Sequence, residues 1–156
     1  MNSCKTESFI NTYNVSISIL RKIAKKVQKI AIPTFIFKDR SLAILETIVK
    51  FLKEKHTLTY HEIAVLINRD DRTIWTAYHR AKKKQKKPQK ITKKPTKNIP
   101  TAIFKDRSVS VLEAVVRFLK EKHNLSYHEI AVLLNRDDRT IWTVYSRVKK
   151  KLQKNE

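Results

Sequence analysis

The chain has 156 residues, with 35 basic and 14 acidic side chains, and its formal net charge is +21. The lone Cys4 excludes an internal disulfide and a cysteine-based zinc finger, and the absence of glycine excludes a glycine-rich phosphate loop. No apolar run approaches the ~20 residues of a membrane-spanning helix. The positive charge is spread along the whole chain, which favours a polyanion such as nucleic acid over a surface tuned for solubility alone.

The N-terminal segment, residues 1–31, predicts a disordered start followed by a helix from about Ile17 to Ile30. Apolar residues recur on one side of this helix and lysines and arginine on the other. We favour a helix docked on the first domain, and a phosphate-binding or membrane-surface helix are the alternatives. The lysines follow the apolar residues, which is the wrong order for a secretory signal. A cytoplasmic protein is therefore expected.

Two repeats follow, residues 32–87 and 99–154, at an offset of 67, and 41 of their 56 aligned positions are identical. Each opens with Ile-Pro-Thr, which the proline restrains to an extended arm. Ser41 and Ser108 are predicted to cap a supporting helix. Its apolar side is formed by Leu42, Leu45, Ile48, Val49 and Leu52 in the first copy, and by Val109, Leu112, Val115, Val116 and Leu119 in the second.

The repeats are separated by residues 88–98, which contain two prolines and four lysines without an apolar period. This composition predicts a flexible basic linker. In extended form it reaches roughly 34 Å at about 3.1 Å per residue, which is about one turn of B-DNA.

The most informative stretch is Leu58 to Lys84, which predicts a helix, a short turn and a second helix. Thr59 and Glu62 form a capping box at the start of the first helix. Asn68 stands where the turn needs a residue with positive φ, and Asp70 is suited to cap the second helix. The second copy repeats these signals as Ser126, Glu129, Asn135 and Asp137.

The second helix of each copy has an inward and an outward side. In the first copy the inward positions are Ile74, Ala77, Tyr78 and Ala81. The outward candidates for DNA contact are Arg72, Thr73, Trp75, Thr76, His79, Arg80 and Lys83, and in the second copy Arg139, Thr140, Trp142, Thr143, Ser146, Arg147 and Lys150. Arg72, Trp75 and Thr76 recur as Arg139, Trp142 and Thr143, whereas His79 becomes Ser146.

This stretch resembles the helix-turn-helix of sigma-factor region 4 and related regulators. Ala64 matches the small residue where the two helices cross, Ile67 the apolar end of the first helix, and Ile74 the anchor of the recognition helix; Ala131, Leu134 and Ile141 match in the second copy. One position departs from the family pattern, since Arg69 and Arg136 stand where an apolar residue usually follows the turn. The resemblance implies a DNA-binding domain, and it also implies RNA polymerase as an alternative partner.

Several roles remain open for individual side chains. Arg72 offers a fork to a guanine edge, a phosphate contact or an ion pair with Asp71. Trp75 could touch thymine methyl groups, although the edge of the core is favoured. Asp71 could accept a hydrogen bond from cytosine or reject wrong bases. The lysines at the end of the helix, Lys82, Lys83 and Lys84 with their copies, are expected to contact phosphate.

We therefore expect an all-α protein with two tandem three-helix helix-turn-helix domains, a basic linker and a short N-terminal helix. The expected function is sequence-specific binding of double-stranded DNA in transcription regulation, at a nucleoid-associated location. Because the copies are related by translation along the sequence, direct-repeat half-sites are expected, although a long linker could allow inverted ones. Non-specific coating of DNA or RNA is the alternative. No enzymatic activity, cofactor, metal, membrane or small-molecule ligand is expected; a zinc-protease motif at His61 would need a second histidine at Val65.

Overall fold

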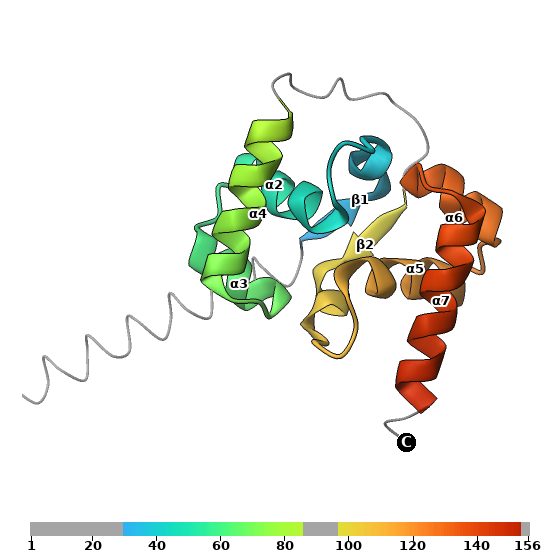
Figure 1. The fold of residues 1–156 in the computed structure, drawn as a ribbon. Helices are drawn as coiled ribbons and strands as arrows, with labels where there is room; N and C mark the ends of the chain where they lie inside the picture. The colour runs from blue at the N-terminus through green and yellow to red at the C-terminus, as the bar shows by residue number, and fades with distance from the viewer. Residues whose placement is uncertain (1–29, 86–96, 154–156) are drawn as a thin grey trace, which may run out of the picture. The chain divides into compact units, whose positions relative to one another are not determined.

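The computed structural model describes residues 30–85 and 97–153. The expected helix from Ile17 to Ile30, apart from its last residue, and most of the linker lie outside these ranges. The chain divides into two compact units, Met1–Ile30 and Ala31–Glu156. The second unit contains both repeats and is mostly helical (Figure 1), so the all-α expectation is confirmed.

Both repeats contain the same succession of a short strand, a 3-10 turn and three helices. The first repeat has β1 (Ala31–Pro33), η1 (Thr34–Lys38), α2 (Ile44–Lys55), α3 (Tyr60–Ile67) and α4 (Asp71–Lys84). The second has β2 (Asn98–Pro100), η2 (Thr101–Lys105), α5 (Val111–Lys122), α6 (Tyr127–Leu134) and α7 (Asp138–Gln153). Asn98, which the sequence placed in the linker, belongs to β2.

The supporting helices α2 and α5 begin two residues later than predicted. The hydroxyl groups of Ser41 and Ser108 donate to Asp39 and Asp106 at 2.6 Å, so they close a local turn and do not cap a helix. The cap of α5 is instead Ser110, whose Oγ accepts from the Glu113 amide. Ser108 and Ser110 both precede α5 within three residues, so the sequence did not show which of them caps it; in the first repeat the cap position is Ala43.

The predicted capping boxes of α3 and α6 are confirmed. Thr59 Oγ1 accepts from the Glu62 amide at 3.2 Å, and Ser126 Oγ accepts from the Glu129 amide at the same distance. In each case the glutamate carboxylate returns the bond by accepting from the cap residue's amide, at 2.6 and 2.7 Å. These reciprocal bonds fix where the helix starts.

The predicted turn is also confirmed, because Asn68 and Asn135 both end their helices at φ 51°. Thr57 and Asn124, before the caps of α3 and α6, have positive φ as well, at 54° and 53°. A β-branched threonine is poorly suited to this region, and asparagine is better suited. In a chain without glycine, asparagine holds three of the four described positive-φ positions.

Apolar residues of all three helices form the core of each repeat. In the first repeat Ile48, Ile63 and Ile74 are 0% exposed. Their counterparts Val115, Ile130 and Ile141 are equally buried in the second. The core therefore comes from the three inward helix sides that the sequence pattern indicated, with α2 packed on α4 and α5 on α7.

A short antiparallel pairing joins the repeats. Ile32 of β1 lies opposite Ile99 of β2, and both are 0% exposed. These two isoleucines are equivalent positions of the repeat, so a local two-fold axis passes between them. Ala31 and Pro33 lie opposite Pro100 and Asn98 respectively, as such an axis requires for a backbone ladder. The sequence predicted the extended arm but not its partner.

Hydrogen bonds between the repeats follow the same axis. Asn68 Nδ2 donates to the Lys105 carbonyl at 2.7 Å, and Asn135 Nδ2 donates to the Lys38 carbonyl at 2.8 Å. Position 105 is equivalent to 38 and position 135 to 68, so each half gives the other the same bond. Such reciprocity defines an isologous interface, the kind that holds symmetric homodimers together.

Arg69 and Arg136 complete this interface. Their Nη2 atoms donate to the carbonyls of Val109 and Leu42, each at 3.1 Å and each in the opposite repeat. These bonds give the polar residue after the turn a role in the fold, because it binds the other half. The copies are therefore related in space by a two-fold axis and not by the translation that their sequence suggests.

Candidate nucleic-acid interface

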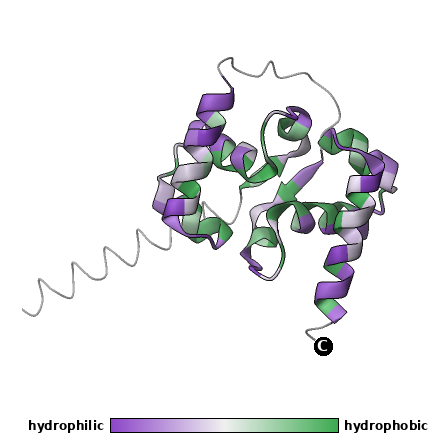
Figure 2. Cartoon of the chain, in the orientation of Figure 1, coloured by the Kyte–Doolittle hydropathy of each residue, from purple (hydrophilic) through white to green (hydrophobic). Residues whose placement is uncertain are grey.

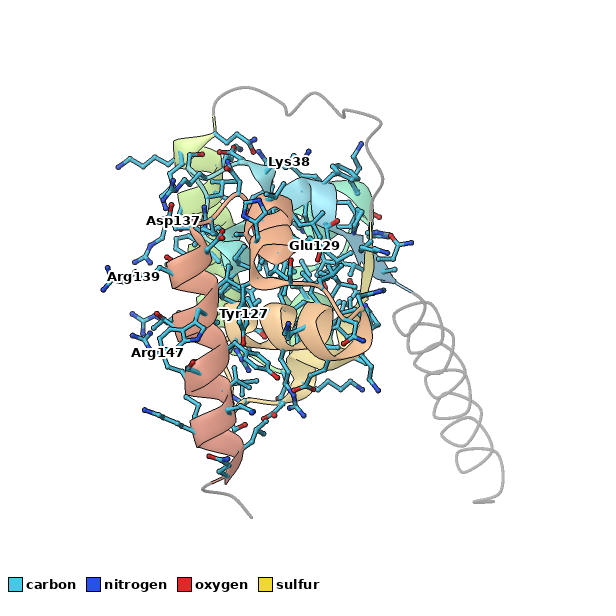
Figure 3. The ribbon with its side chains drawn as sticks, turned by 90° about the vertical axis from the view of Figure 1, so that its right-hand side faces the viewer. Lys38, Tyr127, Glu129, Asp137, Arg139 and Arg147 are labelled. Atoms are coloured by element: carbon cyan, nitrogen blue, oxygen red, sulfur yellow. The ribbon has the colours of Figure 1, made fainter. Side chains whose placement is uncertain are left out.

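The outward residues of α4 and α7 lie where the sequence placed them. On α4, the exposed residues are Arg72, Thr73, Trp75, His79, Arg80 and Lys83, and Thr76 is half-buried. On α7, the exposed residues are Arg139, Trp142, Arg147 and Lys150, and Thr140, Thr143 and Ser146 are half-buried. Figure 3 shows Arg139 and Arg147 projecting from α7 away from the rest of their repeat.

The opposite side of each helix is fixed in the core. Ile74 and Ala81 of α4 are 0% exposed and Ala77 is 5% exposed. On α7, Ile141 and Val148 are similarly buried. Because the inward side is anchored over about two turns, the outward side is presented on a rigid helix.

The tryptophans correct one interpretation. The sequence favoured a place for Trp75 at the edge of the core, but its side chain is 51% exposed and Trp142 is 56% exposed. The Trp75 ring lies against the ring of His79, with centroids 4.1 Å apart. Ser146 replaces this histidine in the second repeat, so Trp142 has no such neighbour at that position. Both indoles belong to the outward side.

Each outward side borders an open hollow. Beside α4, a hollow of about 400 Å³ is lined by Arg72, Thr76 and Arg80 together with the start of α2. Beside α7, a hollow of about 450 Å³ is lined by Arg139, Thr143 and Arg147. The same three positions thus line the equivalent hollow twice.

Two threonines in these hollows are oriented by their own helices. Thr76 Oγ1 donates to the Arg72 carbonyl, and Thr143 Oγ1 donates to the Arg139 carbonyl, each at 2.8 Å. This bond uses the hydroxyl proton, so the oxygen presents its lone pairs outward and is best suited to accept from a partner.

The terminal lysines divide into two groups. Lys84 Nζ lies 2.9 Å from a carboxylate oxygen of Glu46, and Lys151 Nζ lies 2.7 Å from one of Glu113. Both glutamate side chains are 7% exposed. Lys84 and Lys151 therefore neutralise a buried carboxylate, and the phosphate contact expected for them stays a prediction. Lys83 remains exposed on the outward side.

The pKa of the Glu113 carboxyl group is shifted by these surroundings. Burial alone would raise its pKa, but hydrogen bonds from Lys151 and the Ser110 amide, with the charge of Lys151, hold the pKa below its ordinary value. The carboxylate therefore stays ionised inside the fold at neutral pH.

The paired aspartates at the start of each helix are engaged within the protein. Asp70 does not cap α4 through its side chain. Its carboxylate lies 3.2 Å from Arg107, and Asp137 lies 2.9 Å from Arg40. Both pairs join opposite repeats. These are exposed pairs of small energetic value, but they place an arginine beside each aspartate.

Asp71 and Asp138 have a partner that was not expected from the sequence. His61 Nδ1 lies 3.1 Å from Asp71 Oδ2, and His128 Nδ1 lies 3.0 Å from Asp138 Oδ2. Asp71 therefore pairs with His61 and not with Arg72. The signal was the Tyr-His-Glu sequence at each capping box, which sets the histidine in the first turn of its helix, ten residues before the aspartate.

The two outward sides are related by the interface between the repeats. α4 and α7 lie on opposite sides of the β1–β2 pair and run in opposite directions (Figure 1). A two-fold axis keeps equivalent elements at the same height along the axis, so α4 and α7 lie at one level of the protein. Figure 2 shows mostly hydrophilic residues at the C-terminal ends of both helices.

Comparisons of the chain with protein-family models, curated proteins and solved structures found no match. Within residues 30–85 and 97–153, no helix has the length and apolar character needed to cross a membrane. The same residues contain no cluster of three or more histidine, cysteine or acidic side chains arranged to hold a metal ion.

Proposed function

We propose that the chain binds double-stranded DNA through the outward sides of α4 and α7 and regulates transcription. The observation that carries this proposal is the duplicated surface itself. Arginine, threonine and tryptophan recur at identical positions on two exposed helix sides, each anchored from behind by a buried isoleucine. An α-helix of this kind fits the major groove of B-DNA.

Each part of the surface suits a different part of the duplex. Arg72 and Arg139, in the first turn of their helices, can offer a bidentate fork to a guanine edge. Lys83 and Lys150, at the opposite end, suit phosphate, which supplies affinity but little sequence information. Asp70 and Asp137, at the helix starts, face arginine partners, which reduces their repulsion of a polyanion.

Selection from a random duplex library at about physiological salt tests the proposal. We expect enrichment of a sequence that binds the intact chain at least ~1,000-fold tighter than scrambled duplex, which is the lower limit for specific recognition. No enrichment, with tight binding that is lost as salt rises, would contradict sequence recognition and indicate a chain that coats nucleic acid through its charge.

Two substitutions then assign the roles of the helices. Arg72→Ala and Arg139→Ala should each cost about 1–3 kcal/mol on the selected duplex and little on scrambled duplex. The control is Lys55→Ala with Lys122→Ala, which removes two exposed charges at the ends of α2 and α5. Equal losses on both duplexes would reduce the arginines to phosphate contacts.

A further inference from the structure

We propose that the DNA site is an inverted repeat, so that one chain binds in the way a symmetric homodimer would. This inference rests on the proposed function and adds the orientation of the two half-sites. Its basis is the relation between the repeats, which determines how α4 and α7 are presented together.

The interface between the repeats is built from reciprocal contacts. The asparagine-to-carbonyl bonds, the arginine-to-carbonyl bonds and the arginine–aspartate pairs each occur twice, once in each direction across the axis. The axis itself passes between the buried Ile32 and Ile99. A half-turn about this axis therefore places each element of the first repeat, α4 included, on its counterpart in the second.

B-DNA of palindromic sequence has two-fold axes of its own, and matching them places equivalent protein groups on equivalent bases. α4 and α7 run in opposite directions across the protein axis, as two helices entering successive turns of one groove on an inverted repeat must do (Figure 1). A direct repeat would require one half to turn around, which would break the asparagine and arginine contacts and the β1–β2 pairing. The translation of the repeats along the sequence is therefore a poor guide to the operator.

The two half-sites need not be identical at every base. Among the outward positions, only His79 differs from its counterpart, Ser146. Any asymmetry in base preference that arises from the outward side should therefore be confined to the bases next to these two residues.

A panel of duplexes made from the selected half-site tests the orientation with the unmodified chain. The half-site is presented alone, as an inverted repeat, as a direct repeat and as an everted repeat. The paired arrangements have centre-to-centre spacings around 10 base pairs. We expect one inverted arrangement to bind one chain per duplex and about 100-fold tighter than the single half-site. The direct repeat should bind about as tightly as the single half-site.

The outcomes separate this inference from the proposed function. A direct repeat bound as tightly as the inverted one, or more tightly, would overturn the inference while leaving DNA recognition in place. A single half-site bound as tightly as any pair would also overturn it. Failure to select any sequence at all would instead contradict the proposed function.

A double substitution tests whether the reciprocal contacts set the orientation. Arg69→Ala with Arg136→Ala removes both arginine-to-carbonyl bonds but leaves the outward sides unchanged. We expect the preference for inverted over direct repeats to fall about tenfold, with unchanged binding to the single half-site. An unchanged preference in a folded variant would contradict this role. Circular dichroism checks folding, and the panel on the unmodified chain decides the orientation if the variant does not fold.

Discussion

Removing the arginine that follows the turn should destabilise the fold equally in either repeat. Arg69→Ala removes bonds of 3.1 Å to the Val109 carbonyl and 3.0 Å to the Asn68 carbonyl. Arg136→Ala removes the equivalent bonds, of 3.1 Å to Leu42 and 3.3 Å to Asn135. A hydrogen bond from a charged donor contributes about 1.5–3 kcal/mol when buried. Both arginines are half-buried, so the lower part of this range applies, about 1.5–2 kcal/mol for each substitution.

Urea unfolding followed by circular dichroism measures this cost in the free energy of unfolding. Arg80→Ala is the matched control, because Arg80 is exposed on the outward side of α4 and should change stability by less than about 0.5 kcal/mol. A loss within the range of the control, for either arginine, would refute the role given to these bonds. Clearly unequal losses would refute the two-fold equivalence of the two sites.

Three further substitutions test other features of the fold. Thr57→Asn should raise the free energy of unfolding by about 0.5–1 kcal/mol, because asparagine, as at the equivalent Asn124, adopts a positive φ with less strain. A loss of stability in thermal unfolding would contradict this explanation. Glu113 has a lowered pKa when folded, so its stabilising contribution should be full above its ordinary pKa of 4.5 and be lost as the pH falls through the folded value. The difference in the free energy of unfolding between the native chain and Glu113→Gln should therefore become smaller on acidification. A difference that stays constant with pH in urea unfolding would exclude the ion pair with Lys151 as its source. Ala131→Leu, at a 2% exposed position, should overpack the crossing of α6 and α7 and cost about 1–3 kcal/mol, and a neutral result would contradict the close approach of these helices.

Local signals in the sequence predicted the helices and the turn because local chemistry determines them. Thr59 and Glu62 lie three residues apart and find each other within one turn of helix, so their pairing is visible in the sequence. Asn68 was identifiable because a chain without glycine has few residues suited to a positive φ. The predicted cap at Ser41 was wrong for a related local reason, because its hydroxyl donates to the nearby Asp39 carboxylate.

The relation between the repeats was not predictable in the same way. Ile32 and Ile99 are 67 positions apart, and nothing in a three-residue arm says which other segment it will pair with. Arg69 stood out in the sequence only as an exception to a family pattern. Its partner, the backbone carbonyl of Val109, carries no mark in the sequence at all. Contacts of this kind depend on tertiary geometry, which local propensity does not contain.

The outward residues of α4 and α7 were predictable because helical periodicity separates them from the buried side. Trp75 was the exception, since a large aromatic residue next to a buried isoleucine suits either the edge of the core or the surface. Lys84 was the other, because its carboxylate partner, Glu46, lies 38 residues earlier in another helix. Periodicity indicates which side of a helix a residue occupies, but not which distant charge reaches it.

The fluorescence of the two tryptophans gives the most direct test that both helices contact one duplex. Trp75→Phe and Trp142→Phe each leave a single indole, on α7 or α4 respectively, that is about half exposed on the outward side. Both single-tryptophan chains are titrated with the selected duplex, while anisotropy of the labelled DNA reports binding. We expect the emission of both indoles to change along the same binding curve and to saturate at one chain per duplex. Saturated binding with no change at one or both indoles would contradict joint recognition by α4 and α7.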